Sequence, residues 1–386
     1  RSLGRRFWLR PSKRPIPPTG HSALRVAIVG FGTMGKQHAD CITESNVFRL
    51  VAICSQSADV GTVEAQYGVQ LFSCLDELLN DKRCDVDVVI IATPHRQHAG
   101  AVVAALQSNK HVICEKPLTV SGAEADQVLR ANINSNATLT VVSQNRFEPS
   151  YRFVKNLLVS GELGPIRRCS ITETFWRSNA YYASADWRGT WWGEGGGVLM
   201  NQAPHVIDRY VWLCGAPTEV TAICDTQLHN IDVEDSATLI FRHEDGLQGH
   251  IHVNTNECPS QSRLEISCDK GRVCVQDGRI KLDRLAKSVL QETNESSDGF
   301  GKIDFTTENL NGHLLNWAPE LLHSFYEDFA DAIFSNRPPE VTPQQGHDVV
   351  EIINAGHLSS WQQSRVQLPV DRQQYADFQQ AMLASK

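Results

Sequence analysis

The chain has 386 residues, which is too long for one ordinary core and suits two domains. Hydrophobic residues make up 41% of it, as in soluble globular proteins, and no apolar run is long enough to span a membrane. The net charge is −8, and residues 1–22 carry six positive charges and no negative one. The remainder therefore carries −14, which argues against a nucleic-acid-binding body.

Residues 1–22 form a basic arm that we expect to be disordered. Arg5-Arg6 resembles the start of a twin-arginine export signal, but prolines and charges stand at residues 11–18, where such a signal needs an apolar stretch. The eleven cysteines are scattered singly, with no C-x-x-C pair and no metal-ligand spacing. We therefore expect a cytoplasmic protein without a bound metal, with export as the minority alternative.

Residues 23–145 alternate short β-rich runs with helical stretches. The pattern predicts strands at residues 24–29, 48–54, 86–92, 111–114 and 138–142. It predicts helices between them at residues 36–44, 64–67, 75–80, 98–108 and 123–131. This alternation is typical of a Rossmann domain, a doubly wound parallel sheet whose ligand lies beyond the carboxyl ends of the strands.

A glycine-rich turn follows the first predicted strand. Its sequence is Gly30-Phe31-Gly32-Thr33-Met34-Gly35, a G-x-G-x-x-G motif between a strand and a helix. Gly30 allows a tight turn, Gly32 lets the backbone approach a pyrophosphate, and Gly35 permits close packing of the helix on the strand. The motif predicts a dinucleotide-binding site formed by all six residues.

Two further loops are predicted to line the same cofactor cleft. The second strand ends at Ser55 and Gln56, where an NAD-selective protein usually carries an acid for the ribose hydroxyls. No arginine or lysine follows to bind a 2′-phosphate, so NAD and NADP both remain open. The third strand leads into a loop whose predicted cofactor contacts are Ala92, Thr93, Pro94, His95 and His98.

Glu115-Lys116-Pro117 follows the fourth predicted strand. A lone lysine is usually a solvated surface group. Pro117, however, fixes the backbone directly after Lys116, and its peptide bond is a candidate for the cis form. The ammonium of Lys116 could stabilise a developing alkoxide beside the nicotinamide, and Glu115 is a further predicted cofactor contact.

Residues 146–386 are predicted to form a second domain for substrate binding and oligomerisation, whose last helices can pack back on the first domain. Short strands separated by tight turns indicate an open, mainly antiparallel sheet. We expect helices at residues 150–160, 317–335 and 346–364, and a polar loop at residues 284–312. The expected strands lie at 167–175, 219–224, 237–241, 247–253, 264–268, 272–275 and 280–282.

A glycine-rich segment at residues 193–197 precedes a candidate catalytic helix. If that segment is helical, Asn201, His205 and Asp208 share one face, although Pro204 removes one helical hydrogen bond. His205 is a candidate general base, because it follows a glycine loop and aligns with Asn201. The aromatic residues upstream are equally consistent with core packing and with the walls of a sugar pocket.

These motifs together resemble the glucose-fructose oxidoreductase, inositol dehydrogenase and rhizopine catabolism family. The likeness rests on the glycine turn, Thr93-Pro94, Glu115-Lys116-Pro117, Asn145-Arg146-Phe147 and the stretch from Gly195 to Asp208. In that family the lysine and the helix histidine act beside the nicotinamide, which implies catalytic roles for Lys116 and His205. The family commonly has an acid where this chain has Asn201, and an asparagine where it has His95, so a Lys–Asp–His proton network is in doubt.

The resemblance implies an NAD(P)-dependent oxidoreductase that transfers a hydride between nicotinamide and a hydroxyl carbon of a sugar, sugar derivative or cyclitol. Two alternatives are a glycoside-cleaving enzyme with internally recycled cofactor and a non-catalytic nucleotide and sugar sensor. Asn201 joins Lys116 and His205 as the third catalytic candidate. The residues predicted to bind substrate are Arg146, Tyr181, Trp187, Arg188, Asn201 and His205.

The second sheet is also predicted to mediate self-association. Apolar residues occur at both even-numbered and odd-numbered positions of the predicted strands. This suggests a sheet that is apolar on both sides and covered by helices on only one. The residues concerned are Val220, Ile223, Leu239, Phe241, Ile251, Val253, Ile266 and Val273. We expect a homodimer or homotetramer; the alternative is that residues 284–312 and 365–386 fold over the sheet.

Overall fold

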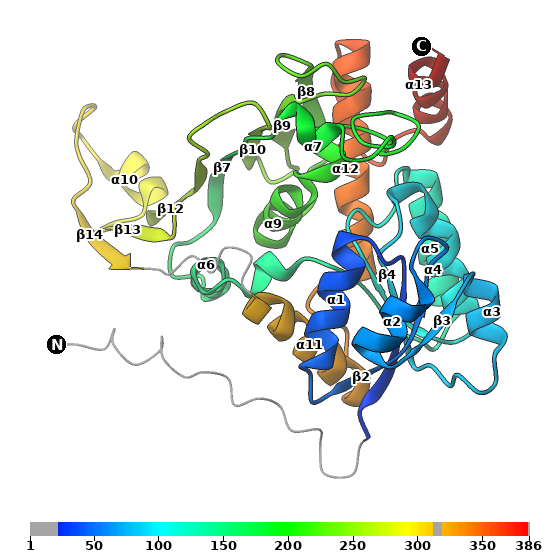
Figure 1. The fold of residues 1–386 in the computed structure, drawn as a ribbon. Coiled ribbons are helices and arrows are strands. Elements are labelled where there is room, and N and C mark those ends of the chain that lie inside the picture. Colours follow the sequence, from blue (N-terminus) through cyan, green and yellow to red (C-terminus); the bar gives the residue numbers. More distant parts are fainter. Residues whose placement is uncertain (1–21, 312–318, 385–386) are drawn as a thin grey trace.

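The computed structural model describes residues 22–311 and 319–384. Within these ranges the chain builds two sheets, with helices on both faces of the first and on one face of the second (Figure 1). No helix of the described residues combines the length and apolar character that crossing a bilayer requires.

The first sheet is parallel, as expected, and has the order β3-β2-β1-β4-β5-β6. Its strands are β1 (Leu24–Val29), β2 (Phe48–Cys54), β3 (Gln70–Phe72), β4 (Val88–Ile91), β5 (His111–Cys114) and β6 (Leu139–Val141). Helices on both faces bury the central strands, which is why these read as continuous apolar runs. The short edge strand β3 was not predicted, because only Leu71 and Phe72 of it are apolar.

The helices of this part are α1 (Thr33–Thr43), α2 (Val60–Tyr67), α3 (Leu75–Asn80), α4 (His98–Gln107) and α5 (Gly122–Ile133), with short 3-10 turns η1 (His95–Gln97) and η2 (Gln144–Phe147). Glycine or a polar residue precedes several of them. Ser121 and Glu124 form a capping box at the start of α5, in which each side chain accepts from the other residue's backbone.

The second sheet has the order β14-β13-β12-β11-β7-β10-β9-β8-β15, and only β7 and β10 pair in parallel. Its strands are β7 (Ile166–Thr174), β8 (Glu219–Asp225), β9 (Ser236–Arg242), β10 (Gln248–Asn254), β11 (Ser262–Cys268), β12 (Gly271–Gln276), β13 (Arg279–Leu285), β14 (Phe305–Asn311) and β15 (Val366–Gln367). The helices are α6 (Pro149–Val159), α7 (Asn179–Tyr182), α8 (Val198–Asn201), α9 (Pro204–Cys214), α10 (Val289–Glu295), α11 (Pro319–Phe334), α12 (Pro343–Gln362) and α13 (Arg372–Ala384).

Two sequence-based expectations for this sheet are wrong. Residues 284–312 are not a loop throughout, because they include α10 and β14; β14 pairs with β13, and its polar side chains hid its strand character. The sheet is also not apolar on both faces. Val220 pairs with Phe241 and both are buried, whereas Ile223, of the opposite parity in β8, is 64% exposed.

The reason for the second error is that strand parity cannot be compared between strands. Register decides which parity of each strand faces inward, so even positions of β8 and odd positions of β9 share the buried face. The open face is instead largely polar. Arg168 and Arg263 both pair with Glu265 on it, and Arg272 pairs with Asp283.

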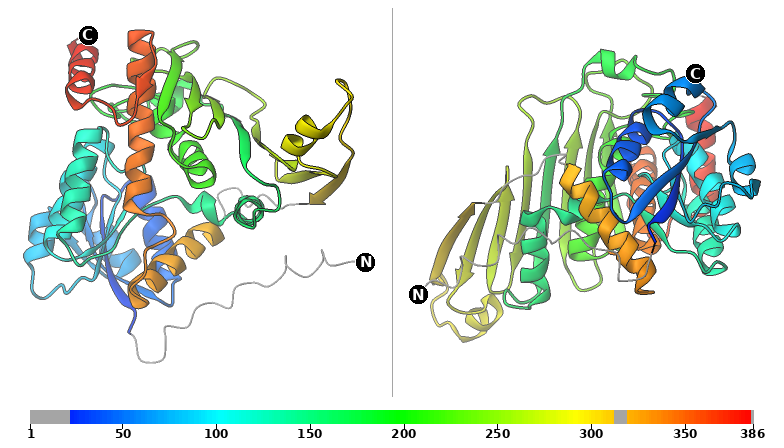
Figure 2. Two further views of the ribbon diagram at one scale, coloured as in Figure 1. Left: turned by 180° about the vertical axis from the view of Figure 1, so that it is seen from behind. Right: turned by 60° about the horizontal axis from the view of Figure 1, so that its bottom comes forward.

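The late helices connect the two sheets. Phe325, Tyr326 and Phe329 of α11 belong to the core of the first sheet, whereas α12 contributes Val350 to that core and Ile352 to the second. Figure 2 shows α12 extending between the two parts of the molecule, with the large sheet open on one side. Residues 317–318 of the predicted 317–335 helix lie outside the described ranges.

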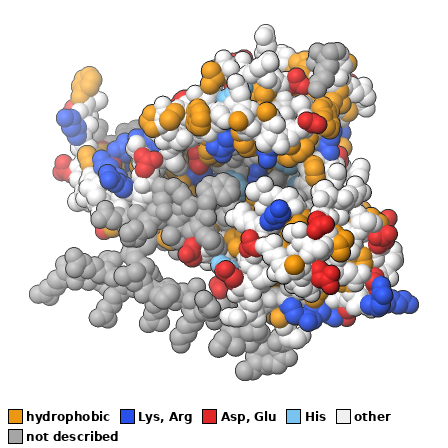
Figure 3. Space-filling model, in the orientation of Figure 1, with side chains coloured by type: hydrophobic (Ala, Val, Ile, Leu, Met, Phe, Trp, Pro, Cys, Tyr) orange, Lys and Arg blue, Asp and Glu red, His pale blue; other side chains and the backbone are white. Residues whose placement is uncertain are grey.

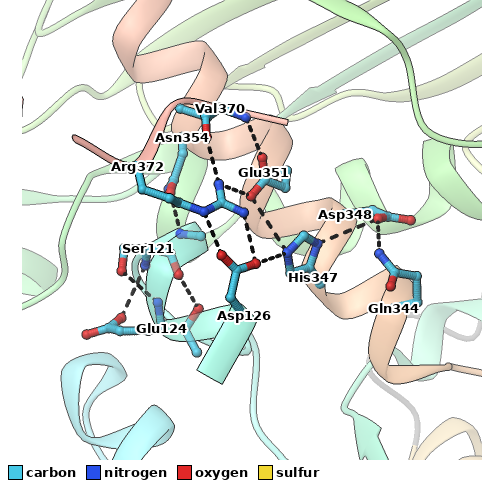
Figure 4. Close-up of polar contacts among 12 residues, drawn as sticks. Ser121, Glu124, Asp126, Gln344, His347, Asp348, Glu351, Asn354, Val370 and Arg372 are labelled. Carbon is cyan, nitrogen blue, oxygen red and sulfur yellow. Dashed lines mark hydrogen bonds and ion pairs between the residues drawn. The ribbon is translucent and has the colours of Figure 1, made fainter. Parts of the chain in front are cut away.

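A network of polar side chains joins α5, α12 and α13 (Figure 4). Arg372, at the start of α13, donates to both carboxylate oxygens of Asp126 in α5, at 2.8 and 2.9 Å. His347 of α12 lies 2.9 Å from the same carboxylate, and Arg372 forms an ion pair of 2.5 Å with Glu351. The successive helices α12 and α13 are thereby held against α5, which is more than 200 residues earlier in the chain.

Candidate active site

The glycine turn between β1 and α1 has the features of a phosphate cradle. Gly30 has φ +93°, and a Cβ on it would lie 2.4 Å from the oxygen of Ala92; a Cβ on Gly35 would lie 2.0 Å from the oxygen of Gly30. Gly32 meets nothing within 4 Å and caps α1 without a side-chain hydrogen bond or an acid in the first turn. The backbone N–H groups here are thus accessible to an anion, and the residues fit a bound dinucleotide.

Other predicted cofactor residues lie at the same edge of the sheet. Ser55 directly follows β2 and accepts through its hydroxyl from the backbone N–H groups of Ser57 and Ala58, both at 3.3 Å; Gln56 beside it is exposed. His98 is fully buried, and its ring nitrogens lie 2.7 Å from the oxygen of Pro117 and 2.8 Å from that of Thr93. His98 therefore ties the loop after β4 to the loop after β5.

Glu115 is a structural anchor of this edge. Its carboxylate lies 2.9 Å from Nε2 of His38 in α1 and accepts from the backbone N–H of Lys116 at 3.1 Å. His38 in turn contacts the hydroxyl of Tyr326 in α11. Burial acts to raise the pKa of Glu115, but the hydrogen bond and charge of His38 outweigh it and hold the pKa at about 2. His38 and Tyr326 could not be predicted in this role from the sequence, because their partners lie far away along the chain.

Lys116 and Asn201, two of the three catalytic candidates, are in direct contact. Lys116 Nζ donates to the main-chain oxygen of Asn201 at 2.7 Å and to its side-chain oxygen at 3.4 Å. Burial lowers the pKa of Lys116, an effect that the charges of Glu115 and Glu194 oppose. The Lys116–Pro117 peptide bond is cis.

His205 lies near Lys116, but on a different helix from Asn201. Pro204 occupies the first turn of α9, so the expected single helix is wrong: α8 ends at Asn201 and α9 begins after it. Burial and the positive charge of Lys116 lower the pKa of His205 to about 4. Its imidazole is therefore neutral at pH 7 and can accept a proton.

Glu194 supplies the carboxylate that position 201 lacks, and it was not among the predicted site residues. One carboxylate oxygen accepts from the side-chain amide of Asn201, and the other accepts from the backbone N–H of Gly189 at 2.7 Å. Because the amide nitrogen of Asn201 donates to Glu194, its oxygen must face Lys116. Burial raises the pKa of Glu194. The only sequence signal was an acid within the glycine-rich segment.

Tyr181, Trp187 and Arg188 form one half-buried side of the site. The guanidinium of Arg188 lies 4.5 Å from the ring centroid of Tyr181 and 4.7 Å from that of Trp187. The ring centroids of Trp187 and His95 are 6.0 Å apart, and His95 Nδ1 lies 3.1 Å from the main-chain oxygen of Glu194. These aromatic side chains thus lie beside Lys116 and Asn201 rather than in the core.

Arg146 does not belong to this group, and its predicted substrate contact is wrong. It is 1% exposed and donates to both carboxylate oxygens of Asp208, at 2.9 and 2.7 Å. Its remaining terminal nitrogen donates at 2.8 Å to the main-chain oxygen of Glu340 and to the side-chain oxygen of Gln345. Arg146 and Asp208 are therefore a buried structural pair that holds η2 against α9.

The space-filling view shows a hollow between the part that carries α7 and the part that carries α1 (Figure 3). Basic and histidine side chains are visible in this hollow, and the surfaces on either side of it carry both hydrophobic and polar side chains. This agrees with the residues assembled above, in which Lys116, His95 and Arg188 come from loops of both parts.

Comparison with known proteins places this site in a family. Residues 24–143 match the oxidoreductase family with an NAD-binding Rossmann fold, and residues 151–274 match the GFO/IDH/MocA C-terminal domain. Inositol 2-dehydrogenase of Salmonella paratyphi B is 36% identical over 336 residues, covering 82% of this chain and 88% of that protein. A 4-carboxy-2-hydroxymuconate-6-semialdehyde dehydrogenase of Sphingobium sp. is 27% identical over 251 residues, or 64% of this chain and 78% of that protein.

A solved structure agrees with these matches. The WlbA dehydrogenase from Bordetella pertussis, in complex with NADH and UDP-GlcNAcA, has a TM-score of 0.74 and 26% identity, and the match covers 90% of this chain and 100% of that one. The glycine cradle, the Glu115-Lys116-Pro117 loop and the two matched domains agree with one another. The chain belongs to the GFO/IDH/MocA family of NAD-binding oxidoreductases.

Proposed function

We propose that this oxidoreductase interconverts a hydroxyl and a carbonyl group on a sugar, sugar derivative or cyclitol. The proposal rests on one observation: Lys116, Asn201 and His205 lie close together, at the edge of the first sheet that carries the glycine turn. The polyhydroxylated ligands named for relatives, inositol and UDP-GlcNAcA, support this substrate class.

Each residue has a distinct role in the proposed reaction. In the oxidative direction, the neutral imidazole of His205 accepts the hydroxyl proton, and the ammonium of Lys116 stabilises the negative charge that develops on the oxygen. Asn201 positions Lys116 and can contact a second hydroxyl. In the reductive direction, His205 returns the proton.

The cofactor site is assigned to residues that the family match covers. Gly30, Gly32 and the N-terminus of α1 would hold the pyrophosphate, and Ser55 would face the adenine ribose. The nicotinamide, when bound, supplies the hydride acceptor or donor. Ser55 neither repels nor strongly binds a 2′-phosphate, so we propose that NADP is accepted alongside NAD.

A substrate screen tests the proposal. The purified chain is incubated with NAD or NADP and with aldoses, inositols or glycosides, and reduced nicotinamide is followed at 340 nm. We expect reduction with at least one free sugar or cyclitol. Release of an aglycone without net reduction, together with cofactor retained through dialysis, would instead identify the glycoside-cleaving alternative; binding without any turnover would identify a sensor.

We also propose that a second copy of the chain covers the open face of the nine-stranded sheet. Paired charges such as Arg272–Asp283 lie on this face, so the expected contact is polar rather than apolar. Sedimentation velocity at micromolar concentration and two salt concentrations tests this. A dimer or tetramer is expected, and a stable monomer at both concentrations would contradict it.

A further inference from the structure

Hydrogen-bond donors outnumber acceptors on the substrate side of the site. The hydroxyl oxygen of Tyr181 accepts from Arg188 Nη1 at 2.7 Å, Asn201 Nδ2 at 3.1 Å and Gln202 Nε2 at 3.2 Å. A phenol oxygen has two lone pairs, and its own proton needs an acceptor as well. Within the described ranges, no residue accepts a hydrogen bond from the Tyr181 hydroxyl.

Arg188 has donors that the protein leaves unused. Its Nε is buried, and none of the described residues accepts from it. The nearest carboxylate, that of Glu194, is 4.0 Å away, at the limit of an ion pair. The oxygens of Glu194 accept from Asn201 and Gly189 instead, and 4.0 Å is too long for a hydrogen bond from the guanidinium.

The charges around this point are predominantly positive. The guanidinium of Arg177 lies 5.3 Å from the Tyr181 ring that Arg188 also covers, and its hydrogen bond is to the backbone oxygen of Trp176. Lys116 lies close enough that both arginines act on it. Three cations therefore lie near the carboxylate of Glu194. Glu115 also acts on Lys116, but its carboxylate is paired with His38.

We propose that the substrate carries an anionic group, a carboxylate or a phosphate, that binds Arg188 and the Tyr181 hydroxyl while its reacting hydroxyl faces Lys116 and His205. The inference rests on the proposed function and narrows its substrate class to sugar acids or sugar phosphates. Oxygen-rich anions supply the acceptors that the site lacks, and a guanidinium binds them through two parallel hydrogen bonds.

Matched substrates test this. Initial rates with NAD are compared for glucose, glucuronate, glucuronamide and glucose 6-phosphate; glucuronamide has the shape of glucuronate without its charge. We expect kcat/KM for one anion to exceed that of glucose by roughly 10- to 100-fold, the scale of a charge-assisted hydrogen bond. The comparison of glucuronate with glucose 6-phosphate shows whether the site binds a carboxylate or a phosphate. Equal kcat/KM for neutral and anionic sugars would overturn the inference while leaving the proposed function intact.

A variant pair assigns the effect to Arg188. Arg188→Gln is expected to bring the ratio of anionic to neutral kcat/KM close to one, chiefly through KM for the anion. Arg167→Gln, an ion-paired arginine on β7, is the control and should keep the wild-type ratio. An unchanged ratio in Arg188→Gln would contradict the assignment.

A binding measurement covers the case in which that variant fails to fold. Wild-type chain saturated with NAD is titrated calorimetrically with gluconate and with inorganic phosphate. Saturable binding of either anion without turnover of any sugar would support the anion site and contradict the proposed function. If neither anion binds and neutral sugars are turned over, the anion site is contradicted and the proposed function is supported.

Discussion

Lys116 makes its shorter hydrogen bond to the main chain of Asn201, not to its side chain: Nζ lies 2.7 Å from the carbonyl oxygen and 3.4 Å from the side-chain oxygen. The main-chain contact is independent of the residue type at position 201. This explains how a chain without the family's acid at that position can still orient its lysine. The side chain of Asn201 instead links Lys116 to Glu194.

Removing either reacting group is expected to lower turnover strongly. Lys116→Met and His205→Gln should each reduce kcat by roughly 100-fold or more, the scale of a positioned acid–base group. Binding of the cofactor, measured by fluorescence titration, should change little. Lys82→Met, at an exposed position, and His323→Gln, at a half-buried position, both lie outside the site and serve as controls. Near-parent turnover in either active-site variant, on a confirmed substrate, would remove that residue's assigned role.

Glu194→Gln tests the carboxylate that stands beside Asn201. The variant removes a negative charge that raises the pKa of Lys116, so that pKa should fall further below its ordinary value. The alkaline limb of the kcat profile should therefore move to lower pH, with kcat at neutral pH reduced about tenfold. Glu64→Gln, on the exposed side of α2, should leave the profile unchanged. An unshifted alkaline limb in Glu194→Gln would show that Glu194 is not coupled to Lys116.

The protonation of His205 gives a separate prediction for the acid limb. Its pKa of about 4 means that the base form persists well below the ordinary histidine range, because burial and Lys116 disfavour the imidazolium. For oxidation, kcat/KM should therefore fall only as the pH drops towards about 4 to 5. A titration of the His205 ring resonance by NMR, assigned through His205→Gln, measures the same pKa directly. A value at or above 6.5 would contradict it.

The sequence predicted best where one local pattern decides the structure. Buried parallel strands are continuous apolar runs, and the glycine motif fixes both a turn and a helix start, so the first sheet and its cofactor edge were found with only β3 missed. Lys116 and Asn201 were both named as catalytic candidates, but the hydrogen bond between them was not predicted.

The errors came from features that only three-dimensional contacts decide. Arg146 is indistinguishable in sequence from a ligand-binding arginine, and burial against Asp208 gives it a structural role. The apolar pattern of the second sheet was misread because register between strands is not visible in one strand's sequence. Glu194 was missed because its function depends on Asn201 and Gly189 being held at its two oxygens.

Cofactor preference can be shifted at the end of β2. Ser55→Asp keeps an acceptor for the neighbouring backbone N–H groups and adds a carboxylate that accepts from the ribose diol and repels a 2′-phosphate. We expect the ratio of kcat/KM for NAD to that for NADP to rise by about tenfold. This is the effect expected of a Coulomb repulsion that solvent partly screens. Ser57→Asp, two residues further and exposed, is the control. Equal effects of Ser55→Asp on both cofactors would show that this position does not face the ribose.

Arg372 is expected to matter for stability rather than for chemistry. It joins α13 to Asp126 of α5 and to Glu351 of α12, and Glu351 is only 5% exposed (Figure 4). Arg372→Gln leaves the Glu351 carboxylate in a buried place with one fewer cation. The side chain of Arg372 is itself 30% exposed, so solvent screens part of the loss. We expect the free energy of unfolding to fall by about 1–3 kcal/mol.

Urea unfolding followed by tryptophan fluorescence measures this change, with Arg365→Gln as the matched control. Arg365 pairs with Glu219 at 3.4 Å but is 62% exposed, and a solvated pair of this kind contributes about 0–1 kcal/mol. Both arginines pair with acids, but Arg372 is the more buried of the two and has two acidic partners, whereas Arg365 pairs, among the described residues, with Glu219 alone. Glu219 is 18% exposed and can be solvated when its arginine is removed, whereas Glu351 is held between α12 and α13. Equal losses in the two variants would mean that the network of Figure 4 contributes no more than an ordinary surface pair, and that the apolar contacts of α13 alone hold it in place.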